Sequence, residues 1–125
     1  VKIGRNLNRF TSKKNHITTK FVSQNTRYML LGNKIRSLRD EQGILQRQVA
    51  AYLEIDTPMF SKIERGDRRA KRSQVIQMAT YFKVDEKEML TLWLADKVLD
   101  ALEDEDELKL TAIETAKSKL MDVNH

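Results

Sequence analysis

The chain has 125 residues, a formal net charge of +5, one proline, four glycines and no cysteine. The lack of cysteine excludes disulfides and thiolate zinc sites. With no apolar run of about 18 residues and no signal-peptide pattern, we expect a cytoplasmic protein without a membrane span. The many Leu, Lys, Glu, Gln and Ala residues, beside so few helix breakers, predict an all-α fold of one domain with extensions.

The charge is divided unevenly along the chain. Residues 1–28 hold seven Lys or Arg and no acid, residues 29–84 hold eleven against six acids, and residues 85–125 hold five against twelve acids. Only the first two segments suit a polyanion. We therefore expect a basic arm over 1–28, a domain suited to a polyanion such as DNA over 29–84 and C-terminal helices over 85–125.

Residues 1–28 have no helical period and are rich in Asn, Thr, Ser and Lys. One interpretation is a basic arm that lies in the DNA minor groove, as homeodomain arms do. The alternative is a flexible leader, because composition alone supports the arm and Met29 is a possible natural start.

The first regular element is a helix predicted over about residues 30–42, with Leu31, Ile35 and Leu38 facing inward. Gly43 is its expected stop, since glycine readily adopts the left-handed conformation that ends helices.

Two short helices follow in close succession. Residues 46–53 carry an apolar stripe at Val49, Ala50 and Leu53. The second helix has Asp56 as its N-cap and Gly66 as its stop, with Pro58 tolerated in its first turn. Two such helices joined by a two-residue turn predict a helix-turn-helix.

Three fragments in order carry a family resemblance. Residues 46–50 resemble a Gln-x-x-Leu-Ala helix opening, residues 63–66 match Ile-Glu-Arg-Gly, and residues 38–39 match a Leu-Arg helix end. Over about residues 31–84 the chain resembles the Xre/Cro family of helix-turn-helix regulators, which includes the lambdoid phage repressors. It departs from the family at Leu45, where a Ser or Thr N-cap is usual, and at Glu54, where glycine is usual.

The resemblance implies a set of functional positions. It pairs Arg39 with Glu64 as a structural ion pair. Lys62 is the best base reader, because its ammonium can donate to guanine O6 and N7. The full base-reading set is Thr57, Pro58, Met59, Ser61 and Lys62. The expected phosphate ligands are Gln46, Arg47, Arg68, Arg69, Lys71 and Arg72, which would set register without reading sequence.

After Gly66 we expect a basic loop over residues 67–72 and then a helix with Ser73 as its N-cap. A charge run alone is usually a solvated surface. The position of this loop directly after the second helix of the motif, which carries the expected base readers, favours phosphate contact instead.

Asp85 and Glu88 form a predicted capping box for a long helix that reaches about Glu103. This helix has too many apolar residues for one stripe, so we expect a second partner beside its own core. That partner is a second subunit or, alternatively, the last helix, predicted over about residues 106–123. The expected dimer interface consists of Leu92, Trp93, Val98, Leu99 and Leu102. The acidic residues 103–107 lack the spacing of a metal loop and are interpreted as a solvated connector.

Enzyme function is not expected, because the only histidines are His16 and His125 and no glycine-rich phosphate loop occurs. We predict no cofactor, metal or catalytic residue. The favoured hypothesis is a five-helix, repressor-like homodimer that regulates transcription from a palindromic operator in a bacterium or phage, with restriction-modification control among the roles that the resemblance implies. The alternatives are the antitoxin of a toxin-antitoxin pair, which would bind DNA and a partner protein, and an RNA-binding role for the arm.

Overall fold

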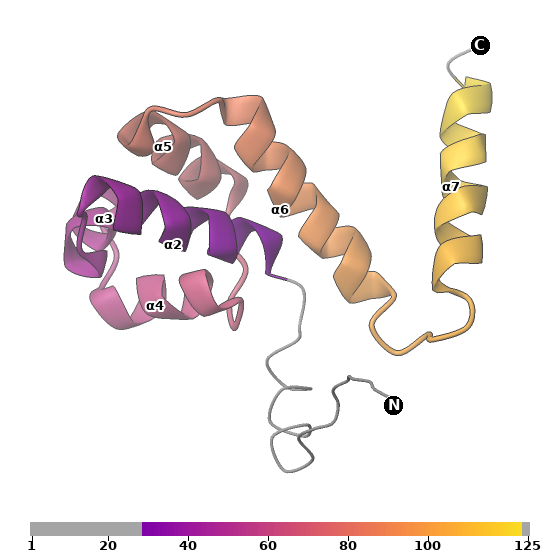
Figure 1. Cartoon of the computed structure of the whole chain (residues 1–125), viewed down its shortest axis with the longest axis horizontal. Coiled ribbons are helices and arrows are strands. Elements are labelled where there is room, and N and C mark those ends of the chain that lie inside the picture. The colour runs from indigo at the N-terminus through magenta and orange to yellow at the C-terminus, as the bar shows by residue number, and fades with distance from the viewer. Residues whose placement is uncertain (1–28, 124–125) are drawn as a thin grey trace, which may run out of the picture.

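The computed structural model describes residues 29–123, and the arm expected over residues 1–28 lies outside them. Within this range the structure is helical and has no strand, as the composition predicts. The helices, shown in Figure 1, are α2 (Leu30–Gln42), α3 (Gln46–Leu53), α4 (Thr57–Arg65), α5 (Arg72–Phe82), α6 (Glu86–Ala101) and α7 (Lys109–Val123).

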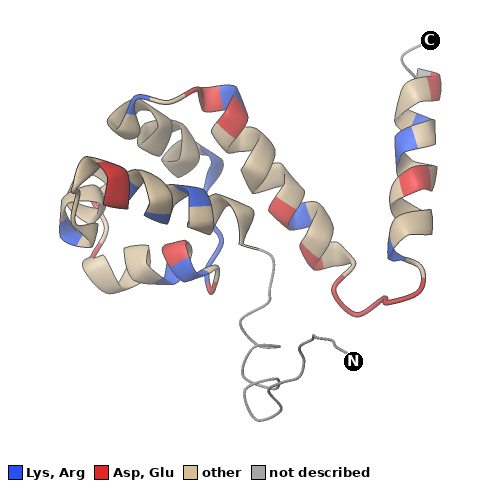
Figure 2. Cartoon of the chain, viewed as in Figure 1, with Lys and Arg blue, Asp and Glu red and all other residues tan. Residues whose placement is uncertain are grey.

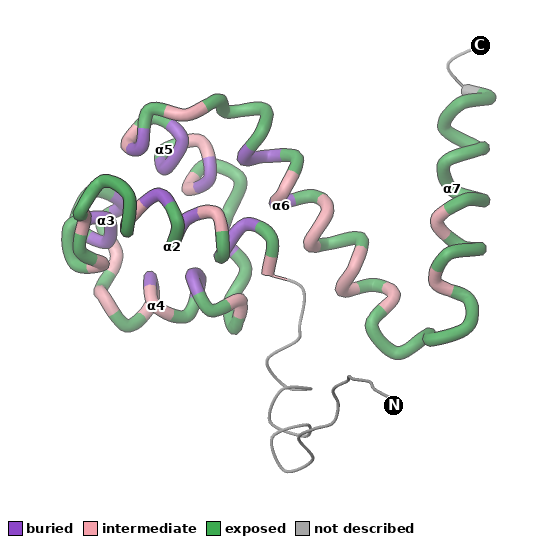
Figure 3. The backbone as a smooth tube through the Cα atoms, in the orientation of Figure 1, coloured by how far each residue is buried: buried purple, intermediate pink, exposed green. Residues whose placement is uncertain are grey.

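Helices α2 to α6 pack around one hydrophobic core. α6 lies against α2 and α5, and α4 lies against α2 and α3. The inward positions expected in the first helix, Leu31, Ile35 and Leu38, are all buried. Figure 3 shows how the buried positions gather where these helices face one another. The largest fully buried side chains are Phe60, Phe82, Ile35, Met78, Met89, Val49 and Val75.

Two glycines occupy positions where a side chain would strain the backbone or clash with a neighbouring helix. Gly66 ends α4 in the left-handed conformation with φ 82°, as its position in the sequence predicts. Gly32 lets α2 approach α4 closely, because a Cβ at this position would lie 2.2 Å from the Glu64 backbone oxygen. α4 therefore packs directly against the backbone of α2.

The predicted helix starts are partly confirmed. Asp56 Oδ1 accepts a hydrogen bond from the Met59 amide at 2.7 Å, and Asp85 Oδ2 accepts one from the Glu88 amide at 2.9 Å. The carboxylate of Glu88 pairs with Lys34 at 3.3 Å, so the reciprocal half of that capping box is not formed.

The N-cap expected at Ser73 is wrong. α5 begins at Arg72, and Lys71 takes the N-cap position. The Gln74 side chain accepts a hydrogen bond from the Lys71 amide at 2.8 Å, which stabilises the earlier start. Arg72 is consequently the first residue of a helix and not the end of a loop.

The core continues past the expected domain edge at residue 84. Met89, Leu90 and Trp93 from the first half of α6 are buried against the other helices. The physical reason is the pairing of α6 with α2 and α5. The boundary between residues 84 and 85 therefore separates segments by charge but not by packing.

α7 stands apart from the bundle in Figure 1, beyond the acidic connector that is coloured red in Figure 2. It takes no part in the substantial helix pairings, and its described side chains are exposed or only partly covered. The alternative in which the last helix covers the second side of α6 is therefore not what the structure shows. Across residues 29–123, every helix is too short or too polar to cross a membrane.

Candidate nucleic-acid interface

The turn between α3 and α4 forms without its usual glycine. Glu54 adopts the left-handed conformation with φ 60° and ψ 42°, which costs a non-glycine residue about 1 kcal/mol. The Ile55 amide donates to the Ala50 carbonyl at 3.0 Å, closing the end of α3. At the other end, Leu45 offers no acceptor, but Gln48 Oε1 accepts from the Leu45 amide at 2.8 Å. Only the Gln48 half of a capping box is therefore formed, and the Gln48 amide donates to the Leu45 backbone carbonyl at 3.0 Å in place of a Ser or Thr side chain.

α4 presents a polar face to solvent. Phe60, Ile63 and Glu64 are buried, so the opposite side of the helix carries Pro58 and Lys62, which are exposed and four residues apart. The remaining expected base readers, Thr57, Met59 and Ser61, are partly exposed. Of these, Met59 packs against the core, so it lies at the margin of the outward face.

Arg65, which is not among the predicted base readers or phosphate ligands, shares the outward face with Lys62. Its Nη1 donates to Ser61 Oγ at 2.7 Å, and its Nε donates to Asp67 Oδ2 at 3.0 Å. The available signal was its spacing of seven residues from Pro58 and four from Ser61, which places it on the same side of the helix. The Ser61 hydroxyl therefore already holds a neighbouring cation.

A hydrogen-bond network ties three helices together beneath this face. Glu64 is only 7% exposed, and its carboxylate accepts from Arg39 Nε at 2.6 Å and from Arg39 Nη2 at 3.0 Å. Gln46 Nε2 donates to the same carboxylate at 2.7 Å. Hydrogen bonding with Glu64 raises the pKa of Arg39 above its ordinary value, so the guanidinium stays charged wherever the protein is folded.

This network changes the place of Gln46, which was expected to bind phosphate. One amide hydrogen of Gln46 is given to Glu64, and the start of α3 is thereby held against α4. The side chain remains partly exposed, with its carbonyl oxygen and its other amide hydrogen outside that hydrogen bond. Gln46 is thus positioned by Glu64 at the edge of the outward face.

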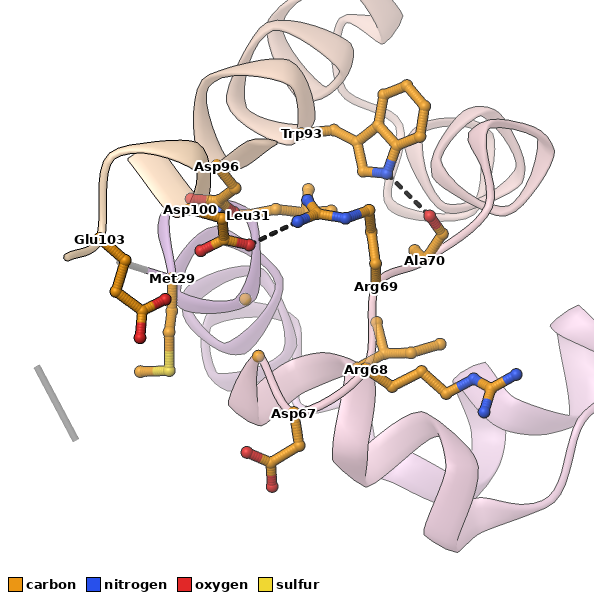
Figure 4. Close-up of a pocket in the computed structure, with 13 residues that line it drawn as sticks. Met29, Leu31, Asp67, Arg68, Arg69, Ala70, Trp93, Asp96, Asp100 and Glu103 are labelled. Atoms are coloured by element: carbon orange, nitrogen blue, oxygen red, sulfur yellow. Dashed lines mark hydrogen bonds and ion pairs between the residues drawn. The ribbon is translucent and has the colours of Figure 1, made fainter. Parts of the chain in front are cut away.

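The expected phosphate-binding cations do not all point the same way. Arg47 is exposed on α3, Arg68 and Lys71 in the loop between α4 and α5, and Arg72 at the start of α5. Arg69 forms an ion pair with Asp100 of α6. Figure 4 shows Arg69 directed toward Asp100 and Arg68 extending away from it. Arg69 therefore connects the basic loop to α6.

Trp93 belongs to the domain's own core. It is 8% exposed, and its Nε1 donates to the Ala70 carbonyl at 2.7 Å. Trp93 is therefore not available for the expected dimer interface, because it is buried and hydrogen-bonded to the basic loop. Leu92 also packs on the core, whereas Val98 is exposed and Leu99 and Leu102 are partly exposed.

Asp96 caps α2 from a distant part of the chain. Its Oδ1 accepts from the Leu30 amide at 2.9 Å, and its Oδ2 accepts from the Leu31 amide at 3.0 Å. Met29, the N-cap residue, has no side chain that could do this. The contact joins residues 66 positions apart, so no local pattern could have predicted it.

A pocket of about 300 Å³ lies where α2, the basic loop and α6 meet. Asp96, Asp100 and Glu103 line one side of it, and Arg69 lies across from them (Figure 4). These groups are largely engaged in the α2 cap and the ion pair described above. The pocket thus marks the joint between the basic loop and α6.

Comparison with known proteins agrees with this geometry. A family model described as a helix-turn-helix domain matches residues 30–92, from the start of α2 into α6. No curated protein and no solved structure matches the chain significantly. The matched segment spans half of the chain and includes both helices of the motif, which confirms the resemblance to helix-turn-helix regulators. The chain therefore belongs to the helix-turn-helix domain family.

Proposed function

We propose that the protein is a sequence-specific, DNA-binding transcriptional regulator that acts as a homodimer on a palindromic operator. The observation that carries this proposal is the outward face of α4, where Lys62 and Arg65 are exposed, together with the exposed cations of α3, the α4–α5 loop and the start of α5. An α-helix fits the DNA major groove, and its exposed polar side chains meet base edges there.

Each group in this face has a proposed task. Lys62 donates to guanine O6 and N7, Thr57 offers its hydroxyl or methyl, and Pro58 makes apolar contact with a thymine methyl. Met59 and Ser61 flank these readers, with Ser61 holding Arg65. Arg65 is positioned for the phosphate beside the groove.

Phosphate contacts would set the register of the complex. The proposed ligands are Gln46, which Glu64 orients, and the exposed Arg47, Arg68, Lys71 and Arg72. Arg69 reaches phosphate only if its pair with Asp100 opens. Two subunits would read half-sites whose centres lie about 34 Å apart.

The first experiment is selection of binding sites from a random duplex library at about 150 mM salt, since affinity without a stated salt concentration cannot be interpreted. The full chain and a version starting at Met29 are compared. We expect both to recover one palindrome. Recovery by the full chain alone would assign residues 1–28 to the DNA site, and no enrichment by either would contradict the proposal.

A salt titration tests the footprint independently. If a dimer contacts about 6 to 10 phosphates, the logarithm of the binding constant falls with the logarithm of salt concentration at a slope of about −5 to −9. A slope near −1 would mean that the proposed cations do not form the interface.

The exposed apolar side chains of α6 and α7 favour a second candidate role, an antitoxin that binds DNA and a basic partner protein. Co-purification of a stoichiometric partner from the native host would support it.

For the proposed regulator, mapping of genomic binding sites would identify the regulated genes, including any restriction-modification operon.

A further inference from the structure

The second half of α6 has an apolar side that its own domain does not cover. We define the outward α6 face as Leu94, Ala95, Val98, Leu99 and Leu102. Leu94 and Val98 are 52% and 51% exposed, and the other three are partly exposed. The helical spacing of these residues places them opposite Met89 and Trp93, which face the core. No charged side chain interrupts the series, so this is an uncovered hydrophobic strip on a folded domain.

α7 carries a matching strip. Leu110, Ile113, Ala116 and Leu120 follow one side of the helix at spacings of three and four residues. Leu110 is 77% exposed and Leu120 is 66% exposed. A 15-residue helix is marginally stable in water unless its apolar side is packed against another element. The presence of α7 as a helix therefore implies a surface on which it docks.

The two strips fit each other in length and charge. At 1.5 Å per residue, α6 and α7 are about 24 and 22 Å long. Asp96 and Asp100 are engaged in the α2 cap and the Arg69 pair, which leaves the five acids of residues 103–107 beside the α6 strip, whereas α7 carries three lysines and two acids. Lys117 lies between Ile113 and Leu120 on the apolar side of α7, where an acidic partner surface would complement it.

The connector argues against a return to the same α6. Residues 103–107 are five consecutive acids whose like charges repel one another, and the connector begins as a turn in which the Glu105 amide donates to the Leu102 carbonyl at 3.0 Å. α7 accordingly stands away from its own α6 (Figure 2). Each copy of the chain carries one α6 strip and one α7 strip. In a two-fold dimer, each α6 strip can therefore be covered by the α7 strip of the other copy.

We propose that α7 of one copy lies on the outward α6 face of a second copy, and reciprocally, so that the dimer forms by exchange of its last helix. The proposal rests on the homodimer proposed above and specifies its surface. Trp93 takes no part in it. Because α6 also holds Arg69 and Ala70, this surface would set the distance between the two reading helices.

Cysteine cross-linking tests the exchange, because the natural chain has no cysteine. Full-length Val98→Cys and Ile113→Cys chains with different tags are mixed and treated with a short bismaleimide. Thiols held together by an interface react at a high effective concentration, so the unlike pair should form in about ten-fold excess over pairs of like chains. The matched control is Val98→Cys with Ser118→Cys, which should lose the product because Ser118 lies on the polar side of α7.

A second variant separates this proposal from DNA binding. Leu110→Glu with Leu120→Glu should convert the dimer to a monomer by light scattering and lower the helical circular dichroism by no more than the 15 residues of α7 contribute. The affinity for a duplex with one half-site should stay unchanged. If the wild-type chain cross-links as expected but prefers no DNA sequence, the exchange stands and the proposed regulator fails.

Four results would overturn the exchange. The first is an intramolecular cross-link at monomer mass in a chain carrying both Val98→Cys and Ile113→Cys, because α7 would then cover its own α6. The second is a dimer linked only between two Val98→Cys chains. The third is a dimer that survives the double Glu variant. The fourth is a chain that stays monomeric at all concentrations. A monomer whose Val98→Cys thiol cross-links only to a different protein counts as the same result.

Discussion

The α3–α4 motif and the α6–α7 region both contain short helices with an apolar stripe, but the stripes end in opposite environments. In α4, Phe60 and Ile63 are buried by the chain's own helices. In α7, Leu110 and Leu120 are exposed, and so are Leu94 and Val98 on α6. The first region is therefore packed within one chain, whereas the second leaves large apolar side chains exposed. This difference separates the motif proposed to bind DNA, which packs within its own domain, from the surface on which the proposed helix exchange rests.

The largest expected effect comes from breaking the network beneath the motif. Glu64→Gln leaves Arg39 charged and without its carboxylate, and removing one partner of a shielded ion pair costs about 3 to 5 kcal/mol. We expect this loss in the free energy of unfolding, measured by urea denaturation. The matched control is Glu88→Gln, whose exposed pair with Lys34 contributes about 1 kcal/mol or less. Equal stability of Glu64→Gln and wild type would refute a structural role for the network.

The next effect concerns DNA and leaves folding intact. Lys62→Ala should lose about 1 to 3 kcal/mol of discrimination at one base position in each half-site. Arg68→Ala, an exposed change in the neighbouring loop, should weaken specific and random DNA alike. Competition binding against single-base operator variants makes the measurement. If both substitutions lower affinity equally on all sequences, the division between base readers and phosphate ligands is wrong.

A smaller effect tests how α6 completes the bundle. Asp96→Ala removes the side chain that caps α2, and loss of an N-cap costs about 0.5 to 2 kcal/mol. Thermal unfolding monitored by circular dichroism should show a lower midpoint. Asp104→Ala in the exposed connector should leave the midpoint almost unchanged. A matching shift in both variants would mean that net charge, and not the cap, is responsible.

The smallest effect is a gain in stability. Glu54→Gly relieves the left-handed strain in the turn and should stabilise the domain by up to about 1 kcal/mol. Lys83→Gly is the matched case, since Lys83 ends α5 with φ 62°. Chemical denaturation measures both. A destabilised Glu54→Gly would show that the Glu54 side chain contributes more than its backbone conformation costs.

Local signals in the sequence were sufficient for the motif itself. Asp56 and Gly66 mark the ends of α4, and the stripe of Val49, Ala50 and Leu53 orients α3, because caps and helical spacing act over only a few residues. The Arg39–Glu64 contact followed from the family resemblance and not from spacing. Helical periodicity places Phe60 and Ile63 on one face of α4 and Lys62 on the opposite face. Once the first face is buried in the core, Lys62 is exposed.

The contacts that bind α6 to the motif were decided by the tertiary structure alone. Asp96 caps a helix 66 residues away, Trp93 bonds to Ala70, and Arg69 turns toward Asp100. In the sequence, Trp93 looked like an interface residue and Arg69 like a phosphate ligand, because each has the composition and position for that role. Which partner such a side chain meets depends on how helices far apart in the chain pack. The sequence by itself therefore determined which helices form and which sides are apolar, whereas packing determined which of those sides remained uncovered.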